Sequence, residues 1–460
     1  MSDPRPSKRS AQRGVAERSP AARATSERAT RLSSTPRRLP ADRYRSRAWH
    51  DLEAERLWPR VWQIACSVDC VREPGDWFEY EIGPLSILVL RGEDGALRAF
   101  QNACRHRGSS LLHGAGSGLR EIRCPYHHWR YDLAGNLRAT SADGMGSGRP
   151  GRLSLVPVQV ASWGGLVFVN PDPQAGPLAE FLKPLQDELA WVRMDEYTCQ
   201  WAFTVPIACN WKLVVDAFIE TYHLHAIHPQ MLAIADDLHT PITLWETHSL
   251  FAQPYGVASP RLEGGASDQA IWEEFVRNLG HRLGIPFAGS GDPGPHPPVP
   301  PGRSMRDVLA ARIRRHLESL GDPYPELSDA QLIDDLHYHF FPNSVFNVFA
   351  GWYGLIRARP GPEPDRCFLD MWNFDWLPKG HPKEHCRPEL VTLAPDAVAP
   401  LGDVMRQDVE NLPRVQKGLA QPGLREVNLV AAESRIGRMH QVLDRWLGTS
   451  LEEELRAAER

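Results

Sequence analysis

The sequence predicts an α+β protein with two folded domains, a small all-β domain followed by a larger domain in which long helices pack on a curved antiparallel sheet. Short alternating apolar runs, bounded by Gly and Pro turns, dominate residues 61–170. Helical patterns and aromatic strand patterns alternate after residue 178. A chain of 460 residues with 42% hydrophobic residues is long enough to bury two cores.

The composition excludes several classes of function. The net charge is −5, so the whole protein offers no electrostatic case for binding nucleic acid or a membrane surface. No apolar run reaches membrane-spanning length, and the N-terminus lacks the apolar core of a secretory signal. Eight cysteines in a chain of this length do not indicate a disulfide scaffold. We therefore expect a cytoplasmic protein.

Residues 1–43 are expected to form a disordered basic tail. Residues 1–40 hold ten Lys and Arg against three acids and almost no large apolar side chains. Such a segment cannot bury enough surface to offset its ordering entropy. An organelle transit peptide is the alternative, but the acids at Asp3, Glu17 and Glu27 weaken it.

The first domain is placed at residues 44–172. A helical pattern over residues 44–57 precedes period-two runs at 77–82 and 86–91. Further strand-like runs at 97–102 and 164–170 flank the most informative motif of the chain. These runs predict a small sheet wrapped around that motif.

The second domain is placed at residues 173–460. It begins with an amphipathic helix near Leu178, a strand at 200–206 and a helical run over 211–225. Residues 259–326 are expected to be a loop-rich insertion, because they contain a Pro/Gly-rich stretch at 289–302. Aromatic strand patterns at 337–349 and 367–376 precede a helical region from about residue 400.

The central motif of the first domain is two Cys/His pairs, Cys104 with His106 and Cys124 with His127. Two Cys and two His could close a zinc site, but zinc fingers group the cysteines in one pair and the histidines in another. Here each half supplies one of each, as in a Rieske centre, where two thiolates hold one iron of a two-iron, two-sulfur cluster and two imidazoles hold the other. The register selects His127 as the ligand, and the adjacent His128 is expected to be a neighbour only.

A second metal site is indicated by His223 and His228, five residues apart, with Glu220 three residues before the first. Two imidazoles and a distant carboxylate form the facial triad of non-haem iron oxygenases, which leaves positions open for oxygen. The alternative is that these histidines are merely satisfied polar residues of a helix.

The Cys/His loops, followed about a hundred residues later by the segment from Glu220 to His228, resemble the large (alpha) subunit of Rieske non-haem iron oxygenases, the aromatic ring-hydroxylating dioxygenase family. The resemblance runs from about residue 44 to the C-terminus. It implies a Rieske domain followed by a helix-grip catalytic domain. It also implies two cofactors, a Rieske 2Fe-2S cluster and a mononuclear Fe(II).

The resemblance assigns His223 and His228 as iron ligands and Glu220 as the acid that joins the two metal sites. Asp216 stands where many dioxygenases have Asn close to the iron, so we expect a hydrogen-bonded acid behind the ligands there, with a fourth ligand as the alternative. His225 should point to a different helix face.

The third iron ligand must come from far downstream. Residues 407–419 resemble the family segment in which an acid precedes a Gln by eight residues on a helix, which favours Asp408. Asp403 is the second choice. Asp370 and Asp375 lie in the aromatic strands and could line the sheet instead.

The resemblance implies a terminal oxygenase component that uses O2 and electrons from a separate reductase, with or without a ferredoxin, to hydroxylate a small organic substrate. An aromatic substrate, mono- or dihydroxylated, is the first expectation. The alternative is a monooxygenase or demethylase of a quaternary ammonium compound such as carnitine or glycine betaine. Glu220, in place of the more usual Asp, is a weak signal for this alternative. The non-enzyme alternatives are a Rieske electron carrier and a binding protein without iron.

By the same resemblance, the cluster of one subunit serves the iron of its neighbour within a homotrimer, with or without a small beta subunit. The substrate pocket is expected among the aromatic strands, where π faces suit a flat hydrocarbon or a quaternary ammonium group. The candidates are Phe340, Phe341, Phe346, Phe349, Trp352, Tyr353, Trp372 and Trp376. Half or more of them could be core residues.

Overall fold

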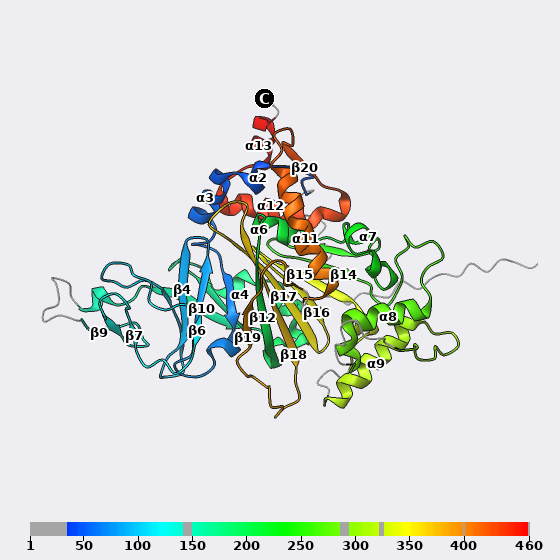
Figure 1. The fold of residues 1–460 in the computed structure, drawn as a ribbon, viewed down its shortest axis with the longest axis horizontal. Coiled ribbons are helices and arrows are strands. Elements are labelled where there is room, and N and C mark those ends of the chain that lie inside the picture. The colour runs from blue at the N-terminus through cyan, green and yellow to red at the C-terminus, as the bar shows by residue number, and fades with distance from the viewer. Residues whose placement is uncertain (1–34, 141–149, 286–293, 322–325, 399–400, 459–460) are drawn as a thin grey trace, which may run out of the picture.

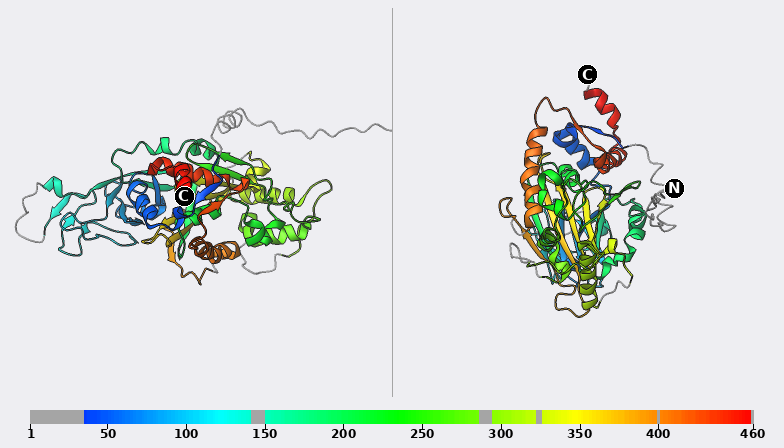
Figure 2. Two further views of the ribbon diagram at one scale, coloured as in Figure 1. Left: turned by 90° about the horizontal axis from the view of Figure 1, so that it is seen from above. Right: turned by 90° about the vertical axis from the view of Figure 1, so that its right-hand side faces the viewer.

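The computed structural model describes residues 35–140, 150–285, 294–321, 326–398 and 401–458. Figure 1 shows the first domain on the left, the large sheet of the second domain in the centre and the helical insertion at the lower right. The C-terminal helices lie above the sheet. Both views of Figure 2 agree with this arrangement.

The first domain is all-β, as predicted. Its seven-stranded sheet has the order β2-β11-β10-β5-β4-β3-β6, and a separate three-stranded sheet has the order β7-β8-β9. The strands are β2 (Gln63–Ser67), β3 (Trp77–Ile82), β4 (Leu85–Arg91), β5 (Leu97–Gln101), β6 (Ala115–Gly116), β7 (Ile122–Arg123), β8 (Arg130–Tyr131), β9 (Leu137–Ala139), β10 (Pro157–Trp163) and β11 (Leu166–Asn170). The Cys104 loop follows β5, and the Cys124 loop joins β7 to β8. The strands β7 and β9 lie at the end of the domain farthest from the second domain (Figure 1), and the Cys124 loop begins there.

The second domain is built on an eight-stranded sheet of order β13-β14-β15-β16-β17-β18-β12-β19. All neighbours are antiparallel except β12 and β19, which run parallel. The strands are β12 (Tyr197–Ile207), β13 (Ile242–Leu244), β14 (Ser249–Gln253), β15 (Asp335–Phe340), β16 (Ser344–Phe349), β17 (Trp352–Pro360), β18 (Cys367–Trp376) and β19 (Glu389–Thr392). Most side chains of β15 to β18 are buried, and these include the polar side chains of His337, Arg357 and Asp370.

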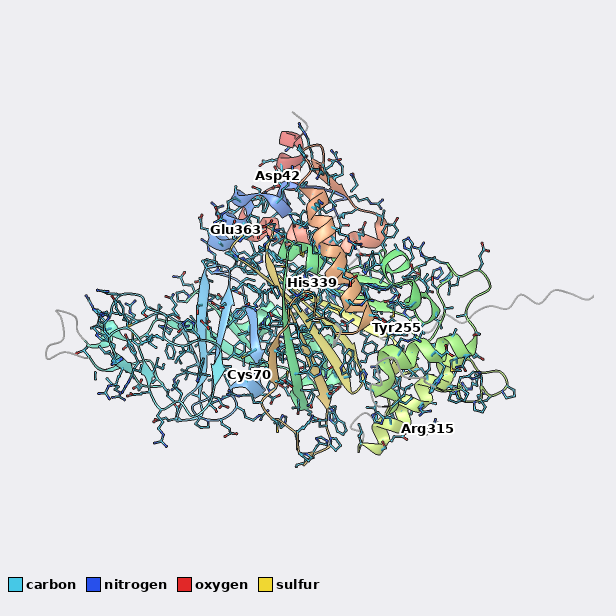
Figure 3. All side chains as sticks on the ribbon, viewed as in Figure 1. Asp42, Cys70, Tyr255, Arg315, His339 and Glu363 are labelled. Carbon is cyan, nitrogen blue, oxygen red and sulfur yellow. The ribbon has the colours of Figure 1, made fainter. Side chains whose placement is uncertain are left out.

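Helices cover this sheet. The helix α6 (Trp211–Phe218) packs on β16, β17 and β18, and α11 (Gly402–Leu419) contacts both α6 and β12. Side chains fill the space between these layers (Figure 3). Further helices of this domain include α4 (Leu178–Phe181), α5 (Leu185–Glu188), α7 (Leu224–Ile227), α12 (Ser434–Leu447) and α13 (Leu451–Ala458). None of the described helices is long and apolar enough to cross a membrane.

The single helix predicted over residues 211–225 is wrong, because the chain forms α6 and then, after a break, the short helix α7. Asn210 caps α6 by accepting a hydrogen bond from Lys212 N at 3.0 Å. At the break, the Glu220 carboxylate accepts hydrogen bonds from the backbone N–H groups of Tyr222 and His223. These side-chain bonds replace helical ones and turn the chain at the predicted metal-binding segment.

The N-terminal segment belongs to the second domain in space, although residues 44–57 were predicted to be part of the first. The strand β1 (Arg38–Pro40) pairs with β20 (Glu426–Asn428), and α2 (Asp42–Arg45) and α3 (Arg47–Arg56) contact α11 and α12. Glu53 of α3 accepts hydrogen bonds from Trp211 Nε1 at 2.8 Å and from Lys212 Nζ, all three side chains being buried. The described residues 35–43 are therefore ordered, and residues 1–34 of the predicted tail lie outside the described residues.

The segment 259–326 was predicted to be rich in loops, but its described residues contain the helices α8 (Asp268–Leu279) and α9 (Met305–Ser319). Each helix has a Ser N-cap. Buried residues recur every four positions along α9, namely Met305, Leu309, Ile313 and Leu317. A short helix, α10 (Asp329–Ile333), leads into β15. The abundant Pro and Gly between the two long helices obscured their periodicity.

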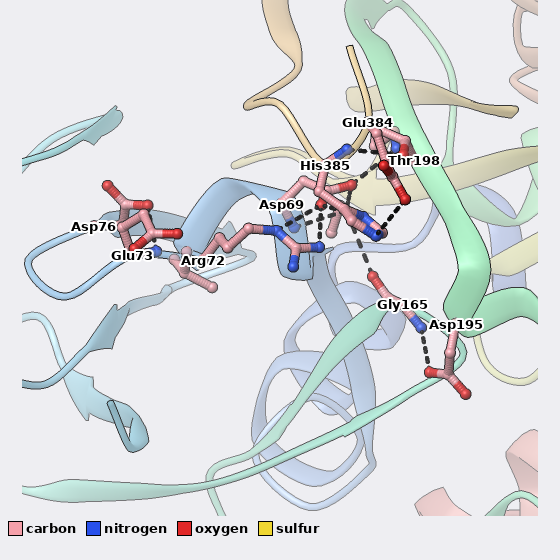
Figure 4. A network of polar contacts seen from close by, with 12 residues as sticks. Asp69, Arg72, Glu73, Asp76, Gly165, Asp195, Thr198, Glu384 and His385 are labelled. Carbon is pink, nitrogen blue, oxygen red and sulfur yellow. Dashed lines mark hydrogen bonds and ion pairs between the residues drawn. The ribbon is translucent and has the colours of Figure 1, made fainter. Parts of the chain in front are cut away.

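A polar network joins the two domains (Figure 4). Asp69 of the first domain accepts a hydrogen bond from Cys199 N of β12 at 2.9 Å and pairs with Arg72 at 2.7 Å. Asp195 of the second domain accepts a hydrogen bond from Gly165 N at 3.0 Å. Because Asp69 is buried and its oxygens are bonded from both domains, this junction fixes how the two domains are oriented.

Candidate functional site

The predicted mononuclear site comes together in space. One ligand atom from each of His223, His228 and Asp408 lies within 4.8 Å of the others, and no other such group of three exists among the described residues. His228 Nε2 lies 3.1 Å and His223 Nε2 lies 3.9 Å from the same oxygen of Asp408. Two imidazoles and one carboxylate therefore face one point, which is the donor set of a non-haem iron site.

His223 is oriented by Glu220. The Nδ1–H group of His223 donates a hydrogen bond to Glu220 Oε1 at 2.5 Å. Since a carboxylate only accepts, this bond places the proton on Nδ1 and leaves the Nε2 lone pair directed at Asp408. Burial would lower the pKa of His223, but the neighbouring Glu220 and Asp408 carboxylates outweigh burial and raise it.

His228 is oriented by a residue that the sequence analysis did not single out. Gln407 Oε1 accepts hydrogen bonds from His228 Nδ1 at 2.7 Å and from Gln230 Nε2 at 2.8 Å. In both His223 and His228, the Nδ1 atom is thus bonded to a protein acceptor, and the Nε2 atom that faces Asp408 is left for a metal ion. The only signal for Gln407 in the sequence is its position next to Asp408 on α11.

The rival acids lie elsewhere. Asp403 is on the exposed side of α11, where it pairs with Arg406. Asp370 is buried and paired with Arg357 and Arg359, at 2.8 Å and 2.6 Å. Asp375 accepts a hydrogen bond from Asn373. None of the three belongs to the His223, His228 and Asp408 group.

Asp216 lies behind the metal-binding group and is not part of it. Its Oδ2 accepts a hydrogen bond from the Tyr44 hydroxyl at 2.7 Å, and its buried Oδ1 has no partner among the described residues. Burial raises the pKa of Asp216 to about 8, although the Tyr44 hydrogen bond and the Lys212 charge act in the opposite direction. His225 turns away and bonds the carbonyl of Tyr222.

The Cys/His loops of the first domain place buried thiols behind more exposed imidazoles. Cys104 and Cys124 are buried, whereas His106 is exposed and His127 is half-buried. The two rings lie edge to face with their centroids 4.6 Å apart, and Trp129 stacks on His106 at 4.8 Å. This division of sulfur and nitrogen donors suits a cluster whose two irons take different ligands.

A single zinc ion fits these loops poorly. Within the described part of the chain, Cys104, His106, Cys124 and His127 do not converge within 4.8 Å of one another, as one tetrahedral ion would require. Burial acts to raise the pKa of Cys124, but hydrogen bonds from the backbone N–H groups of His127 and Tyr126 outweigh it and lower the pKa. His128 has φ +56°, a conformation that Gly adopts without strain.

The mononuclear group lies between two cavities. A cavity of about 460 Å³ opens on the outer side, and one of about 590 Å³ lies over the sheet. Among the described residues, Ala217, Glu220, His223 and Asp408 alone line both cavities. The larger cavity is within the size range of sites for small organic ligands.

The larger cavity has an aromatic lining, as predicted, but with different members. Phe349, Trp352 and Trp372 line it, while Phe340, Phe341, Phe346, Tyr353 and Trp376 are core residues instead. The aromatic residues that the sequence analysis missed are Trp201, Phe203, Phe218, Phe251 and Tyr255. They come from β12, α6, β14 and the segment that follows β14, all of which lie outside the two aromatic runs of the sequence.

Two family profiles match the chain. The family described as "Ring hydroxylating alpha subunit (catalytic domain)" matches residues 190–449, and the "Rieske [2Fe-2S] domain" matches residues 61–148. The two matches follow the two domains of the structure.

Among characterised proteins, the chain is 32% identical over 226 residues to the carnitine monooxygenase oxygenase subunit of Escherichia coli (strain K12), covering 48% of this chain and 59% of that protein. It is 33% identical over 194 residues to the glycine betaine monooxygenase oxygenase subunit of Chromohalobacter salexigens, covering 42% and 44%. The matches thus span less than two thirds of these relatives.

Solved structures share the fold over most of their length. A quaternary ammonium Rieske monooxygenase in complex with L-carnitine has a TM-score of 0.63 at 19% identity, covering 90% of this chain and 96% of that chain. A naphthalene 1,2-dioxygenase from Rhodococcus sp. bound to indole has a TM-score of 0.59 at 19% identity, covering 89% and 94%.

Proposed function

Because this chain belongs to the ring hydroxylating alpha subunit family and carries a Rieske [2Fe-2S] domain, we propose that it is the terminal oxygenase component of a multi-component oxygenase. The observation that carries the proposal is the group of His223, His228 and Asp408, which opens onto a cavity of about 590 Å³. An electron carrier has no need of a three-donor group at the wall of a ligand-sized cavity.

In this proposal, His223, His228 and Asp408 hold the mononuclear iron, and Cys104, His106, Cys124 and His127 hold the cluster. The iron, when bound, supplies oxygen activation with electrons provided by the cluster. Glu220 and Gln407 keep the two histidines in the tautomer that binds metal. Asp216 lies behind Glu220 and supports the outer wall of the site through Tyr44.

Electrons reach the iron from a neighbouring copy of the chain. Figure 1 shows β7, which leads into the Cys124 loop, at the left end of the molecule, whereas α11 crosses the centre in front of the sheet and α7 lies to its right. The exposed His106 imidazole of one copy can approach Glu220 of the next through the cavity of about 460 Å³, which is lined by Glu220, Glu426 and Glu433. We also propose that three copies form a closed ring, that an external reductase supplies electrons with or without a ferredoxin, and that the protein is cytoplasmic.

The substrate proposed is a quaternary ammonium compound rather than the aromatic compound first expected. The support is the similarity to carnitine and glycine betaine monooxygenase oxygenase subunits. The aromatic lining of the cavity agrees with either class, since the same faces stack on rings and attract ammonium groups.

The test combines iron analysis with turnover. We expect about three irons per chain, two in the cluster and one at the mononuclear site, and substrate-dependent O2 uptake with a surrogate reductase. Labelled oxygen should appear in the product of a quaternary ammonium substrate. About two irons per chain and no O2 uptake would instead identify an electron carrier, and uptake with aromatic compounds alone would reject the proposed substrate class.

A further inference from the structure

The carboxylates that line the cavity of about 590 Å³ differ in the positive charge beside them. Among the described residues they are Glu220, Asp335, Asp375 and Asp408. Glu220 Oε1 lies 2.5 Å from His223 Nδ1, and Asp408 Oδ1 lies 3.9 Å from His223 Nε2. Burial acts to lower the pKa of His223, but these two carboxylates raise it, and an iron ion held by this group would add positive charge. The negative charge at the iron group is therefore already compensated.

Asp335 is buried in the cavity wall. It is 3% exposed, and Asn347 Nδ2 donates a hydrogen bond to its Oδ2 at 2.7 Å. Burial raises the pKa of Asp335 to about 7, against the Asn347 hydrogen bond and the charges of Arg282 and Arg435. This carboxyl group therefore interacts with protein groups rather than with the contents of the cavity.

Asp375 differs from the other three carboxylates. It is half-buried, as are Met371 and Asn373, which also line the cavity. Residues two apart in a strand point to the same side, so these three side chains of β18 form one row along the cavity. Burial raises the pKa of Asp375 to about 6, against the Asn373 hydrogen bond and the Lys383 charge. Lys383 is exposed and is not among the described residues that line the cavity, so the Asp375 carboxylate is open to a cation from outside the protein.

The aromatic rings of the cavity differ in the same respect. Some of them already carry a guanidinium group of the protein, with Arg435 over Phe251 at 4.6 Å, Arg282 over Phe349 at 4.2 Å and Arg357 over Trp372 at 5.7 Å. No such cation lies over Trp201 or Trp352 in the described part of the chain, and both rings are half-buried. Indole faces attract cations more strongly than other aromatic side chains do. These two rings are therefore available to a cationic ligand.

The sheet places the two indoles and Asp375 around Asn373. Trp352 of β17 lies directly opposite Asp375, and Trp201 of β12 lies directly opposite Asn373. Directly opposite side chains point to the same face of a sheet, with their Cβ atoms roughly 5 Å apart. The three strands are neighbours in the order β17-β18-β12, in the centre of Figure 1. One carboxylate and two indole faces thus meet on one face of the sheet.

The Trp352 ring is held in position by its neighbours. Its Nε1–H group donates to Asn373 Oδ1 at 2.6 Å, and Asn373 Nδ2 donates to Asp375 Oδ2 at 3.0 Å. Gly354 gives the ring room, because a Cβ atom at position 354 would lie 3.3 Å from Trp352 Cη2. Side chains that are already ordered lose little conformational entropy when a ligand binds. The arrangement is therefore preorganised.

We propose that Asp375, Trp352 and Trp201 form the subsite that binds the ammonium group of the substrate, and that Asn373 positions Trp352 and Asp375. The inference rests on the proposed function and assigns the charged part of its substrate to one part of the cavity. The indole faces contact the methyl groups and attract the positive charge, and the carboxylate supplies the opposite charge. Asp375 is thus a specificity-determining residue, which favours a cation over a neutral molecule of the same shape.

The test measures binding by calorimetry to the full-length, metal-loaded protein at about pH 8, above the pKa of about 6 of Asp375. The probes are choline and 3,3-dimethylbutanol, which share their shape and their hydroxyl group but differ in whether a positive charge is present. We expect choline to bind the wild type roughly tenfold tighter or more. Equal affinities for the two probes would overturn the inference.

Two variants then locate the subsite. In Asp375→Asn, choline affinity should fall by roughly tenfold to hundredfold, while the affinity for 3,3-dimethylbutanol stays within about twofold of the wild-type value. Asn keeps an acceptor for the Asn373 amide, so a merely structural role of Asp375 would leave choline binding unchanged. Trp352→Leu should weaken choline binding by roughly tenfold more than it weakens 3,3-dimethylbutanol binding, because both probes lose apolar contact but only choline loses the cation–π contact.

Matched controls replace the same residue types elsewhere in the cavity lining. Asp335→Asn removes a carboxylate on which Arg282 and Arg435 act, and Phe251→Leu removes a ring that already carries the Arg435 guanidinium. Both controls should keep the wild-type ratio of the two affinities. A ratio that falls as far in the controls as in Asp375→Asn and Trp352→Leu would overturn the inference.

The remaining outcomes separate the inference from the proposed function. If one of the two subsite variants fails to fold, the other decides. Wild-type choline affinity in the folded variants, together with O2 uptake on quaternary ammonium compounds by the wild type, would reject the subsite and keep the proposed function. If no quaternary ammonium compound binds the wild type or supports O2 uptake, the inference and the proposed substrate class fail together, while family membership stands.

Discussion

Replacing Gln407 by Leu should weaken iron binding at the mononuclear site without affecting the cluster. Leu has a similar size but cannot accept a hydrogen bond. The substitution leaves two donors without their acceptor, His228 Nδ1 and Gln230 Nε2, which lie 2.7 Å and 2.8 Å from Gln407 Oε1. The His228 ring is then free to rotate or to carry its proton on Nε2, the atom that faces Asp408 at 3.1 Å.

The size of the effect follows from burial. Loss of a partner that orients a metal-binding histidine weakens metal affinity by roughly 10- to 100-fold, which is about 1.4 to 2.8 kcal/mol. The His228 side chain is only 2% exposed, so water cannot readily replace Gln407, and we expect a value near the upper end.

The assay is competition for ferrous iron against a chelator, with the cluster absorbance recorded on the same sample. Gln407→Glu keeps an acceptor at this position and should retain iron. Glu410→Gln, at an exposed position of the same helix, is the matched surface control. Wild-type iron affinity in Gln407→Leu would refute the reasoning that this residue sets the His228 tautomer.

Four further substitutions test other parts of the site. Asp408→Ala should reduce iron from about three to about two per chain by metal analysis while the cluster spectrum is unchanged, and full mononuclear occupancy would reject the ligand. Glu220→Gln should keep both metals but lower turnover by roughly 10- to 100-fold in the O2 uptake assay, whereas normal turnover would exclude its proposed role in electron transfer. Asp216→Asn should become progressively more stable than the wild type between about pH 4 and 8. The raised pKa of about 8 gives the folded wild type a stabilising proton that is fully present below the ordinary pKa and lost as the pH rises through 8; melting temperatures that change in parallel across this range would contradict it. Lys212→Met should lower the free energy of unfolding by about 3 kcal/mol in denaturant unfolding, because it leaves the buried Glu53 without its positively charged partner. The double variant with Glu53→Gln should regain stability, and no recovery would contradict this cause.

The sequence predicted the main architecture because its signals are local. Period-two runs such as that of β4 and the paired Cys/His spacings depend on a few adjacent residues, and both family profiles agree with the domain order inferred from them. The prediction that Asp408 meets His223 and His228 came from the family resemblance, since no local pattern relates positions so distant in the chain.

The parts that the sequence did not reveal depend on tertiary contacts. The break between α6 and α7 arises because the Glu220 side chain bonds backbone N–H groups, which helical periodicity does not register. Helices α2 and α3 precede the first domain in sequence but contact α11 and α12. The role of Gln407 likewise depends on His228, which lies far away in the sequence.

Two cavities meet at the iron-binding residues, and substitutions in one cavity leave most of the other cavity unchanged. In the part of the chain that the structure describes, Ala217, Glu220, His223 and Asp408 alone belong to both walls, and every other lining residue belongs to one cavity. Substitutions on the sheet side can therefore alter which molecule binds without changing the residues that line the other cavity. Such a division allows enzymes that act on different substrates to keep the same iron-binding residues.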